Sequence, residues 1–526
     1  MASPFLTNTG SDARGRFFRL GALRELLLWC LPALVCGGVA RGLFLAHFPY
    51  GYIHPDSADF LVTADRFLNH HHWVIHSKRQ FLAPILFLLP ILLKIPCVLV
   101  IAWGQHLFGL IYIVMTGALV RYWTVYWKQW IVPATALTAL NPAVLYYEHT
   151  LISDFQYLWF VTALALAGVA YALERTRGRL ILLLLALLLA AGSRPEGKLF
   201  VLFCMALVPL LHWGAWRRLA IIGGITATFC VATWMSSRNT EAGLHLYSTL
   251  LPLAPETPKS APEFGPVIAP LRNERLARGA LNPPELSMEG KRIWPLATAY
   301  LKGKDPAGKW PTEASVGNFC ERLAMEAARN RPYLVPLITF DKFLQGTVYS
   351  LSDDLDKDWL QETQISSCSH KPWMLQLMPR MTGLPIYSMD DLTAYVRKEF
   401  TPLQRDWFGE LQRGTFAFTT GARIPWPGEN RETPGIPLFY LLGAAGMAMG
   451  MIRPGPMRKF HIAWVLALGF TGSAVMLTGP VIPRYRFVFD PFVLLYLFVL
   501  ADGIVALVFR RRVAAGGCES RGSSAA

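Results

Sequence analysis

The chain has 526 residues, of which 53% are hydrophobic and 16% are charged, and its mean hydropathy is +0.34. This composition excludes an ordinary soluble protein and indicates a polytopic membrane protein. Backbone polar groups in lipid must be paired within the chain, so each long apolar run is predicted to be a helix and the fold class is all-α. The net charge of +15 does not indicate nucleic-acid binding, because much of the excess lies in short segments beside apolar runs.

The hydropathy pattern predicts about ten transmembrane helices. The first apolar run follows a basic stretch and is too long for a signal peptide, so it is expected to remain as the first helix. Basic segments recur at RYWTVYWK, ERTRGR, WRR, RPGPMRK and FRRRV, which predicts that these turns and both termini face the cytoplasm. The predicted helices cover residues 26–46, 97–120, 130–147, 155–173, 180–193, 198–215, 219–235, 436–452, 460–478 and 487–509.

Three regions follow from this pattern. Residues 1–235 are predicted to form an N-terminal transmembrane region of about seven helices, whose first outer loop, 47–96, contains a shorter apolar run expected to be interfacial or re-entrant. Residues 236–433 are predicted to form an extracytoplasmic module, and residues 434–526 about three helices with a short cytoplasmic tail. Cys320 and Cys368 both fall in the module and could form a disulfide if that side is oxidising.

Four short polar clusters fall on the predicted outer side of the membrane. Charged groups at a membrane boundary are costly, so they are functional candidates. Two clusters carry carboxylates and two carry paired cations. They are HPDSADF, with His54, Asp56 and Asp59; YYEHTLISD, with Glu148, His149 and Asp154; SRPEGK, with Arg194, Glu196 and Lys198; and PRYRFVFDP, with Arg484 and Arg486.

This combination suits the transfer of a sugar from a lipid-linked phosphate to a hydroxyl. A carboxylate can take the proton of the acceptor hydroxyl as the bond to the anomeric carbon forms. Arginines can hold the phosphate in bidentate geometry and stabilise the charge that it gains on leaving. No general acid is required, because a phosphate is already a good leaving group.

The motifs resemble those of the GT-C superfamily of integral-membrane glycosyltransferases, and most closely glycosyltransferase family 39, which includes protein O-mannosyltransferases and relatives of the aminoarabinose transferase of lipid A. HPDSADF is similar to the acidic motif that opens the first outer loop in those proteins. KRQFLAP resembles the basic stretch that follows it, SRPEGK the apex of a helical hairpin, and RYRFVFDP the element before the last helix. RNRPYLVPLITFDKFL is similar to an amphipathic segment of their outer module.

The resemblance implies a GT-C-like fold, a polyprenyl-phosphate sugar as the donor, inversion at the sugar carbon and an active site on the extracytoplasmic face. The acceptor is expected to be a glycan, a lipid or a protein in the cell envelope, and the location a bacterial inner membrane, with membrane lipids as further partners. The expected roles are Asp56 as catalytic base; Glu148 and Asp154 as positioners of the acceptor or a metal; Arg194, Lys198, Arg484 and Arg486 as ligands of the donor phosphate; and Asp59 and His54 as secondary participants.

Structural alternatives stay open for these residues. Asp56 fits the start of a helix in SADFLVTADRFL, and Asp59 fits a solvated acid one turn further on. Arg194 and Lys198 fit snorkelling anchors at the interface, as does Arg41 near the end of the first helix.

A metal is left open as well. The run HHHW, from His70 to Trp73, is expected to be an interfacial loop, because three consecutive histidines cannot all face one way on a helix. A divalent ion between Asp56 and Glu148 remains possible.

Two rival functions remain at this point. A transporter or flippase of a lipid-linked saccharide would also need cations and acids near the membrane, but paired inverted repeats with broken helices are absent from the pattern. A non-catalytic protein of envelope assembly would keep the fold and tolerate the loss of Asp56.

Overall fold

The computed structural model is helical, as predicted. Two short strands, β1 (Arg423–Ile424) and β2 (Ile436–Pro437), form an antiparallel pair, and the other elements of the described chain are helices. The residues described are 20–47, 49, 51–52, 56–72, 80–211, 222–223, 226, 240–277, 286–347, 373–400, 407–425, 435–455, 457–478 and 486–522.

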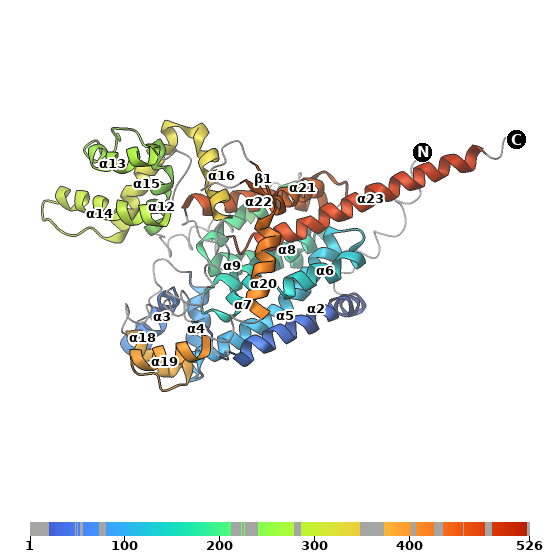
Figure 1. The fold of residues 1–526 in the computed structure, drawn as a ribbon, viewed down its shortest axis with the longest axis horizontal. Helices are drawn as coiled ribbons and strands as arrows, with labels where there is room; N and C mark the ends of the chain where they lie inside the picture. Colours follow the sequence, from blue (N-terminus) through green and yellow to red (C-terminus); the bar gives the residue numbers. More distant parts are fainter. Residues whose placement is uncertain are drawn as a thin grey trace.

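The helices follow one another through three parts of the chain (Figure 1). The first part holds α2 (Leu20–His47), α3 (Ser57–His70), α4 (Leu82–Leu92), α5 (Cys97–Trp123), α6 (Trp127–Ala139), α7 (Pro142–His149), α8 (Asp154–Leu173), α9 (Arg177–Ser193), η2 (Pro195–Phe200) and α10 (Val201–Leu211). The second holds α12 (Thr240–Leu250), η3 (Leu251–Leu253), α13 (Phe264–Ala277), α14 (Leu286–Lys304), α15 (Glu313–Asn330), η4 (Pro332–Leu334), α16 (Val335–Gly346), α18 (Trp373–Thr382), α19 (Met389–Phe400), α20 (Trp407–Phe416) and the π-helical turn η6 (Ala417–Gly421). The third holds α21 (Leu438–Ile452), α22 (Met457–Thr478) and α23 (Asp490–Gly522).

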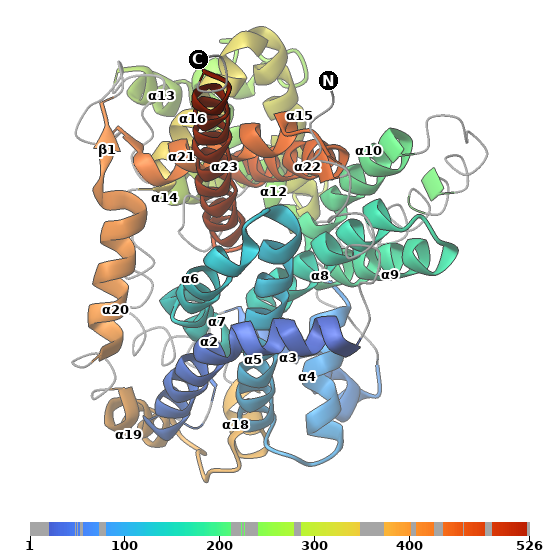
Figure 2. The same cartoon turned by 90° about the vertical axis from the view of Figure 1, so that its right-hand side faces the viewer.

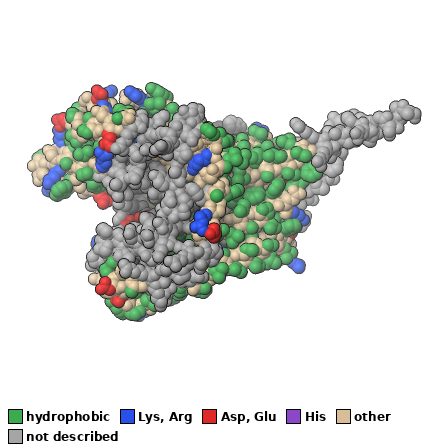
Figure 3. Space-filling model, viewed as in Figure 1, with side chains coloured by type: hydrophobic (Ala, Val, Ile, Leu, Met, Phe, Trp, Pro, Cys, Tyr) green, Lys and Arg blue, Asp and Glu red, His purple; other side chains and the backbone are tan. Residues whose placement is uncertain are grey.

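Five of the described helices are long and apolar enough to cross a membrane. They are α2, α5, α8, α22 and α23, over the spans Gly21–Ala46, Val98–Trp123, Asp154–Leu173, Met457–Thr478 and Asp490–Phe509. Their outward-facing side chains are largely hydrophobic, as the described surface in Figure 3 shows. The chain is a multi-pass membrane protein. The total of about ten stays a prediction, because most of 219–235 lies outside the described residues and α9, α10 and α21 are shorter than 18 residues.

The segment expected to be a single helix over 130–147 is broken. α6 ends at Ala139, and Asn141 caps α7 by accepting hydrogen bonds from the backbone N–H groups of Ala143 (3.0 Å) and Val144 (3.3 Å). Pro142 occupies the first turn of α7, where its missing N–H is not needed. The Asn–Pro pair therefore ends one helix and starts a second, and α7 leads directly into one of the acidic clusters.

The short apolar run in the first outer loop forms α4, which has 11 residues. At about 1.5 Å per residue this helix covers roughly half of a hydrocarbon core of about 30 Å. It packs against α3, α5 and α9 and exposes leucine side chains such as Leu86 and Leu89. The helix is too short to span a membrane, and its interfacial or re-entrant position stays a prediction.

The residues predicted to form one outer module pack in two places. Helices α12 to α16 have a hydrophobic core of their own, built around Tyr247, Phe264 and Phe319. By contrast, α18 to α20 add side chains such as Met378 and Phe408 to the core of the membrane helices. Figure 2 shows α20 along one edge of the molecule, between β1 and α19. We refer to residues 240–347 as the α12–α16 module.

The α12–α16 module is attached to the C-terminal end of α22. The Thr249 hydroxyl donates to the backbone oxygens of His245 (2.8 Å) and Leu477 (3.2 Å), and Lys342 donates to the Thr249 oxygen at 2.8 Å. Cys320, one of the two cysteines considered for a disulfide, is fully buried in the module core, and burial raises the pKa of its thiol to about 12. Cys368 lies outside the described residues.

The opposite end of the bundle is tied together by Asp502 on α23. Its carboxylate accepts hydrogen bonds from the backbone N–H groups of Val125 (2.9 Å) and Tyr126 (2.8 Å), just before α6, and from Trp130 Nε1 at 3.2 Å. Arg453 forms an ion pair with it at 2.6 Å. Two turns predicted to be cytoplasmic, RYWTVYWK and RPGPMRK, therefore meet at this end, from which α23 extends away from the module (Figure 1).

Replacing Asp502 by Ala is expected to lower the free energy of unfolding by about 3–5 kcal/mol, because two helix-start N–H groups and a guanidinium lose their partner. Titration with SDS in mixed micelles measures this change. Glu25→Ala is the control: Glu25 pairs with Arg121 (3.2 Å) and Lys128 (3.0 Å) at the same end but is 37% exposed, so a loss below about 1 kcal/mol is expected. Equal losses in both variants would contradict the assignment of Asp502 as the main tie.

Candidate active site

The segment Tyr147–Asp154 contacts all three of the other polar clusters. It begins in the last residues of α7 and ends at the first residue of α8. On one side it pairs with the first outer loop: the Tyr52 N–H donates to His149 O at 2.7 Å, and the Leu151 N–H donates to Tyr52 O at 2.9 Å. The Ser57 hydroxyl adds a bond to Leu151 O at 2.7 Å. The first and second acidic clusters are thereby held together.

Asp56 stands immediately before α3, between these two anchor points. It is half-buried and occupies the N-cap position, but its side chain makes no capping hydrogen bond to the helix. The Asp56 side chain therefore does not cap α3, which was the structural alternative considered for this residue. Asp59 lies one turn further on, in the first turn of α3, and is also half-buried. His54 lies outside the described residues.

Glu148 is completely buried, and both of its carboxylate oxygens are engaged. Oε1 accepts from Arg41 Nη2 at 2.5 Å, and Oε2 accepts from His106 Nδ1 at 2.8 Å. Arg41, expected to be an interfacial anchor, is only 3% exposed and also donates to the backbone oxygens of Gly37 (3.1 Å) and Ala139 (3.2 Å). The pair joins α2 to α7 inside the apolar core.

The polar network continues from Glu148 along the segment. His106 Nε2 lies 2.9 Å from Nδ1 of His149, so its ring connects two successive residues of the segment. Gln105 Nε2 donates to the backbone oxygens of Glu148 and Thr150, each at 3.1 Å. The first bond gives the buried Glu148 carbonyl a partner, and the second adds to the bond that Thr150 O accepts from the Ile152 N–H at 2.9 Å. α5 therefore holds the backbone between residues 148 and 150 in one conformation.

Small residues make room for this network. A Cβ atom added at Gly109 of α5 would overlap the Glu148 carboxylate, and one added at Gly37 of α2 would lie 2.7 Å from Ile113 Cδ1 and 3.0 Å from Arg41 Nη1. Gly51 in the first outer loop is enclosed in the same way, by Leu151 and by the backbone oxygens of His149 and Val98. The close approach of these backbones requires glycine at each position.

At the far end of the segment, Asp154 connects to the third cluster. It is fully buried at the start of α8 and forms an ion pair with Arg194. Arg194 also bonds Glu196 through Nε at 3.1 Å, and Lys198 follows in the same 3₁₀ turn, η2. Gly197 permits this turn, since a Cβ there would overlap Ala190 O of α9. Arg194 and Lys198 are each less than 10% exposed, so they are not anchors in the interface.

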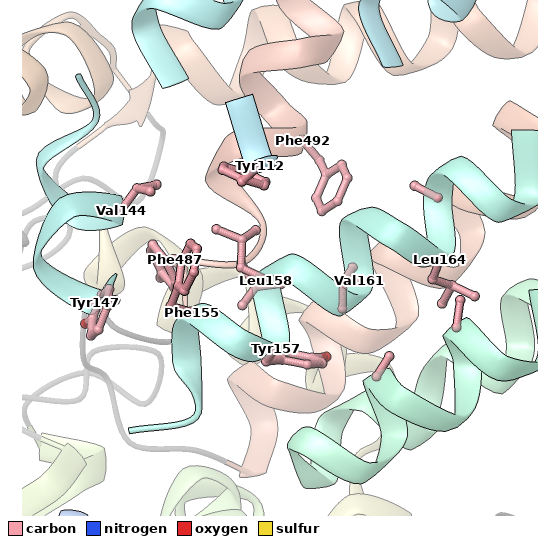
Figure 4. Packing of buried hydrophobic residues seen from close by; sticks show 14 of the residues in the cluster. Tyr112, Val144, Tyr147, Phe155, Tyr157, Leu158, Val161, Leu164, Phe487 and Phe492 are labelled. Carbon is pink, nitrogen blue, oxygen red and sulfur yellow. The ribbon is translucent and has the colours of Figure 1, made fainter. Parts of the chain in front are cut away.

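The fourth cluster meets the segment through an aromatic contact. The rings of Tyr147 and Phe487 lie 4.3 Å apart, and both face the aromatic core shown in Figure 4. Arg486, next in the chain, donates to the Tyr440 hydroxyl at 2.9 Å, and that hydroxyl donates to Asp490 Oδ1 at 2.6 Å. Burial alone would lower the pKa of Arg486, but Tyr440 and Asp490 raise it above its usual value, so the guanidinium stays charged. Arg484 lies outside the described residues.

The donor set does not fit a metal ion bridging Asp56 and Glu148. Arg41 and His106 already engage the two oxygens of Glu148, and a cation placed there would meet the guanidinium. Over the described part of the chain no group of three or more His, Cys, Asp or Glu side chains is arranged to hold a metal. His71 and His72 of the HHHW run are exposed at the end of α3.

The site contains five further residues that were not predicted as members: Arg41, Gln105, His106, Tyr440 and Asp490. Arg41, Gln105 and His106 each interrupt an apolar run, and that interruption is a signal of function inside a membrane helix. The signal does not say which partner each side chain meets.

Comparison with known proteins adds one likeness. No protein-family model and no curated protein matches the chain. Among solved structures the chain is similar to ArnT from Cupriavidus metallidurans, crystallised with bound undecaprenyl phosphate. The sequence identity is 13%, the match covers 89% of this chain and 78% of that chain, and the TM-score is 0.29. At this TM-score no residue role is carried over from ArnT, and the site rests on its own geometry.

Replacing Gly109 by Ala is expected to displace the Glu148 carboxylate and break its bonds to Arg41 and His106. A buried ion pair broken in this way costs about 3–5 kcal/mol of unfolding free energy, which SDS titration measures. Gly104→Ala on the same helix is the control, because a Cβ there meets nothing within 4 Å. In a Glu148→Ala background the Gly109 change should cost little more, since the overlapping group is gone. Full additivity of the two changes would contradict this packing.

Proposed function

We propose that the chain is an integral-membrane glycosyltransferase of the GT-C type. It moves a sugar from a polyprenyl-phosphate donor to an acceptor on the extracytoplasmic side of the membrane, with both termini in the cytoplasm. The observation that carries the proposal is the convergence of four polar clusters on the segment Tyr147–Asp154. A carboxylate and several cations near one membrane boundary are what transfer from a lipid phosphate requires.

Asp56 acts as the general base in this proposal. The acceptor oxygen attacks the anomeric carbon while its proton passes to the Asp56 carboxylate, and the bond from that carbon to the phosphate oxygen breaks. The electron pair of the broken bond remains on the phosphate, which leaves as polyprenyl phosphate. Asp56 suits the role because it is half-buried, whereas Glu148 and Asp154 are fully buried and paired with arginines.

The cations hold the phosphate and stabilise the charge it gains. Arg194 directly precedes the 3₁₀ turn η2, Lys198 lies within it, and Arg486 stands just before the last helix. The bonds of Arg194 to Asp154 and Glu196 fix the direction of its guanidinium. Arg484 joins these cations in the proposal. Guanidinium groups suit a phosphate because they bind two of its oxygens at once.

Glu148 and Asp154 take a different role from the one expected for them. Burial keeps both carboxylates away from an acceptor or a metal. We assign them to position the chain: Glu148 fixes α7 against α2 and α5, and Asp154 fixes the start of α8 against η2. Glu148 and Asp154 thus fix the two ends of the segment Tyr147–Asp154, and Asp56 lies on the loop that pairs with this segment.

Turnover of purified protein with a panel of polyprenyl-phosphate sugars tests the proposal. Release of polyprenyl phosphate is the readout. Asp56→Asn is expected to lower kcat by about 10²- to 10⁴-fold, the usual contribution of a general base, with little change in the KM for the donor. Asp59→Asn is the matched control, one turn along the same helix, and is expected to keep most of the activity.

Two outcomes would overturn parts of the proposal. Equal turnover of wild type and Asp56→Asn would exclude Asp56 as the base. Movement of a fluorescent lipid-linked saccharide across proteoliposome membranes, with no release of polyprenyl phosphate from any donor, would favour a flippase instead. Wild-type protein that neither transfers nor moves a donor would favour a non-catalytic role in envelope assembly.

A further inference from the structure

A polar groove lies on the α12–α16 module, away from the candidate active site. It runs along α15, between that helix, the loop at residue 260 and the end of α14, and has a volume of about 730 Å³. The side chains that line it are Ser260, Leu301, Ser315, Asn318, Glu321, Arg322, Met325, Glu326 and Arg329.

Glu326 of α15 binds the loop that forms one side of the groove. One of its carboxylate oxygens accepts from the backbone N–H of Lys259 and the other from that of Ser260, each at 2.8 Å. Both bonds run from the loop to α15, so the loop is held at the edge of the groove. A carboxylate that accepts two N–H bonds is also less available to its neighbours on the helix.

Arg322 and Arg329 are left without a protein partner as a result. They stand four residues before and three residues after Glu326, at the spacings where a carboxylate and a guanidinium on one helix usually pair. Within the described chain, neither arginine forms a hydrogen bond or an ion pair. Two other arginines of the module are paired, Arg292 with Glu274 (2.7 Å) and Arg272 with Glu256 (3.1 Å). Two guanidinium groups therefore face the groove with their donors available.

The remaining lining defines the kind of ligand. Asn318 and Glu321 offer an amide and a carboxylate that hydrogen-bond hydroxyl groups, and no bond from either to another described side chain exists. Met325, 45% exposed, offers an apolar surface on which the face of a sugar ring can rest. Arginines select a carboxylate or phosphate group, while Glu321 disfavours a ligand with a charge on every unit.

We propose that this groove binds an anionic saccharide. Arg322 and Arg329 are seven residues apart, which is about 10 Å along a helix, so a ligand that touches both is longer than one sugar unit. The module lies at the same end of the molecule as the candidate active site (Figure 1). The groove therefore holds a part of the acceptor remote from the reacting hydroxyl. This last step rests on the proposed function; the binding itself does not.

Binding is measured on the full-length protein in nanodiscs of phosphatidylcholine, which carry no net charge. The probe is a hyaluronan hexasaccharide, an acidic hexamer that carries a carboxylate on every second unit, with maltohexaose as its neutral counterpart. The wild type is expected to bind the acidic hexamer at least tenfold more tightly than maltohexaose. The double variant Arg322→Ala, Arg329→Ala is expected to lose at least tenfold in affinity for the acidic hexamer.

Two control variants separate this site from general charge attraction and from catalysis. Arg292→Ala removes an equally cationic side chain from the same module and is expected to bind like the wild type. Asp56→Asn is expected to lose turnover and keep binding.

If the double variant binds like the wild type, or if Arg292→Ala loses as much affinity, the groove is not the site. Tighter binding of maltohexaose than of the acidic hexamer would overturn the ligand class. Binding that survives while no donor is turned over would overturn only the proposed function.

Discussion

The buried ion pair between Arg41 and Glu148 is the interaction on which the arrangement of α2, α5 and α7 depends. Moving two charges out of water costs several kcal/mol for each ion, and the cost is offset only where the geometry is good and further hydrogen bonds complete the group. Here His106 takes the second oxygen of Glu148, and Arg41 also donates to two backbone carbonyls. Loss of either partner would leave a charge in an apolar core, so α2, α5 and α7 are confined to one arrangement.

That confinement extends along the segment Tyr147–Asp154 through bonds to its backbone and rings. Glu148, His149 and Thr150 are consecutive, and their carbonyls or rings are held by residues of α5. The next bonds run outward: Tyr52 pairs with this backbone on both sides, and Ser57 binds Leu151. Asp56 lies between Tyr52 and Ser57. The bonds of Tyr52 and Ser57 thus connect the chain around Asp56 to the backbone that follows the buried Arg41–Glu148 ion pair.

The helices and the polar clusters could be predicted from the sequence. A bilayer requires long apolar runs within it and favours basic residues on one side of it, and both leave a direct pattern in the sequence. The break between α6 and α7 could have been read from Asn141–Pro142. The pairing of Arg41 with Glu148 could not, since the two are 107 residues apart and an arginine near the end of an apolar run looks the same whether it snorkels or is buried. Gly37 and Gly109 make room for that pairing, but glycine in a membrane helix also serves simply to let two helices pack closely, so its presence does not identify a buried ion pair.

The excess of carboxylates at the site then has a physical reason. The proposed transfer requires one base, yet Glu148 and Asp154 both lie on the segment Tyr147–Asp154, and Asp56 lies on the loop that is hydrogen-bonded to it. Glu148 and Asp154 are fully buried and each is engaged by an arginine. Glu148 instead pairs with Arg41 and links α7 to α2. Asp154 pairs with Arg194 and links α8 to the start of η2. Of the three, Asp56 at the start of α3 is the one that is only half-buried.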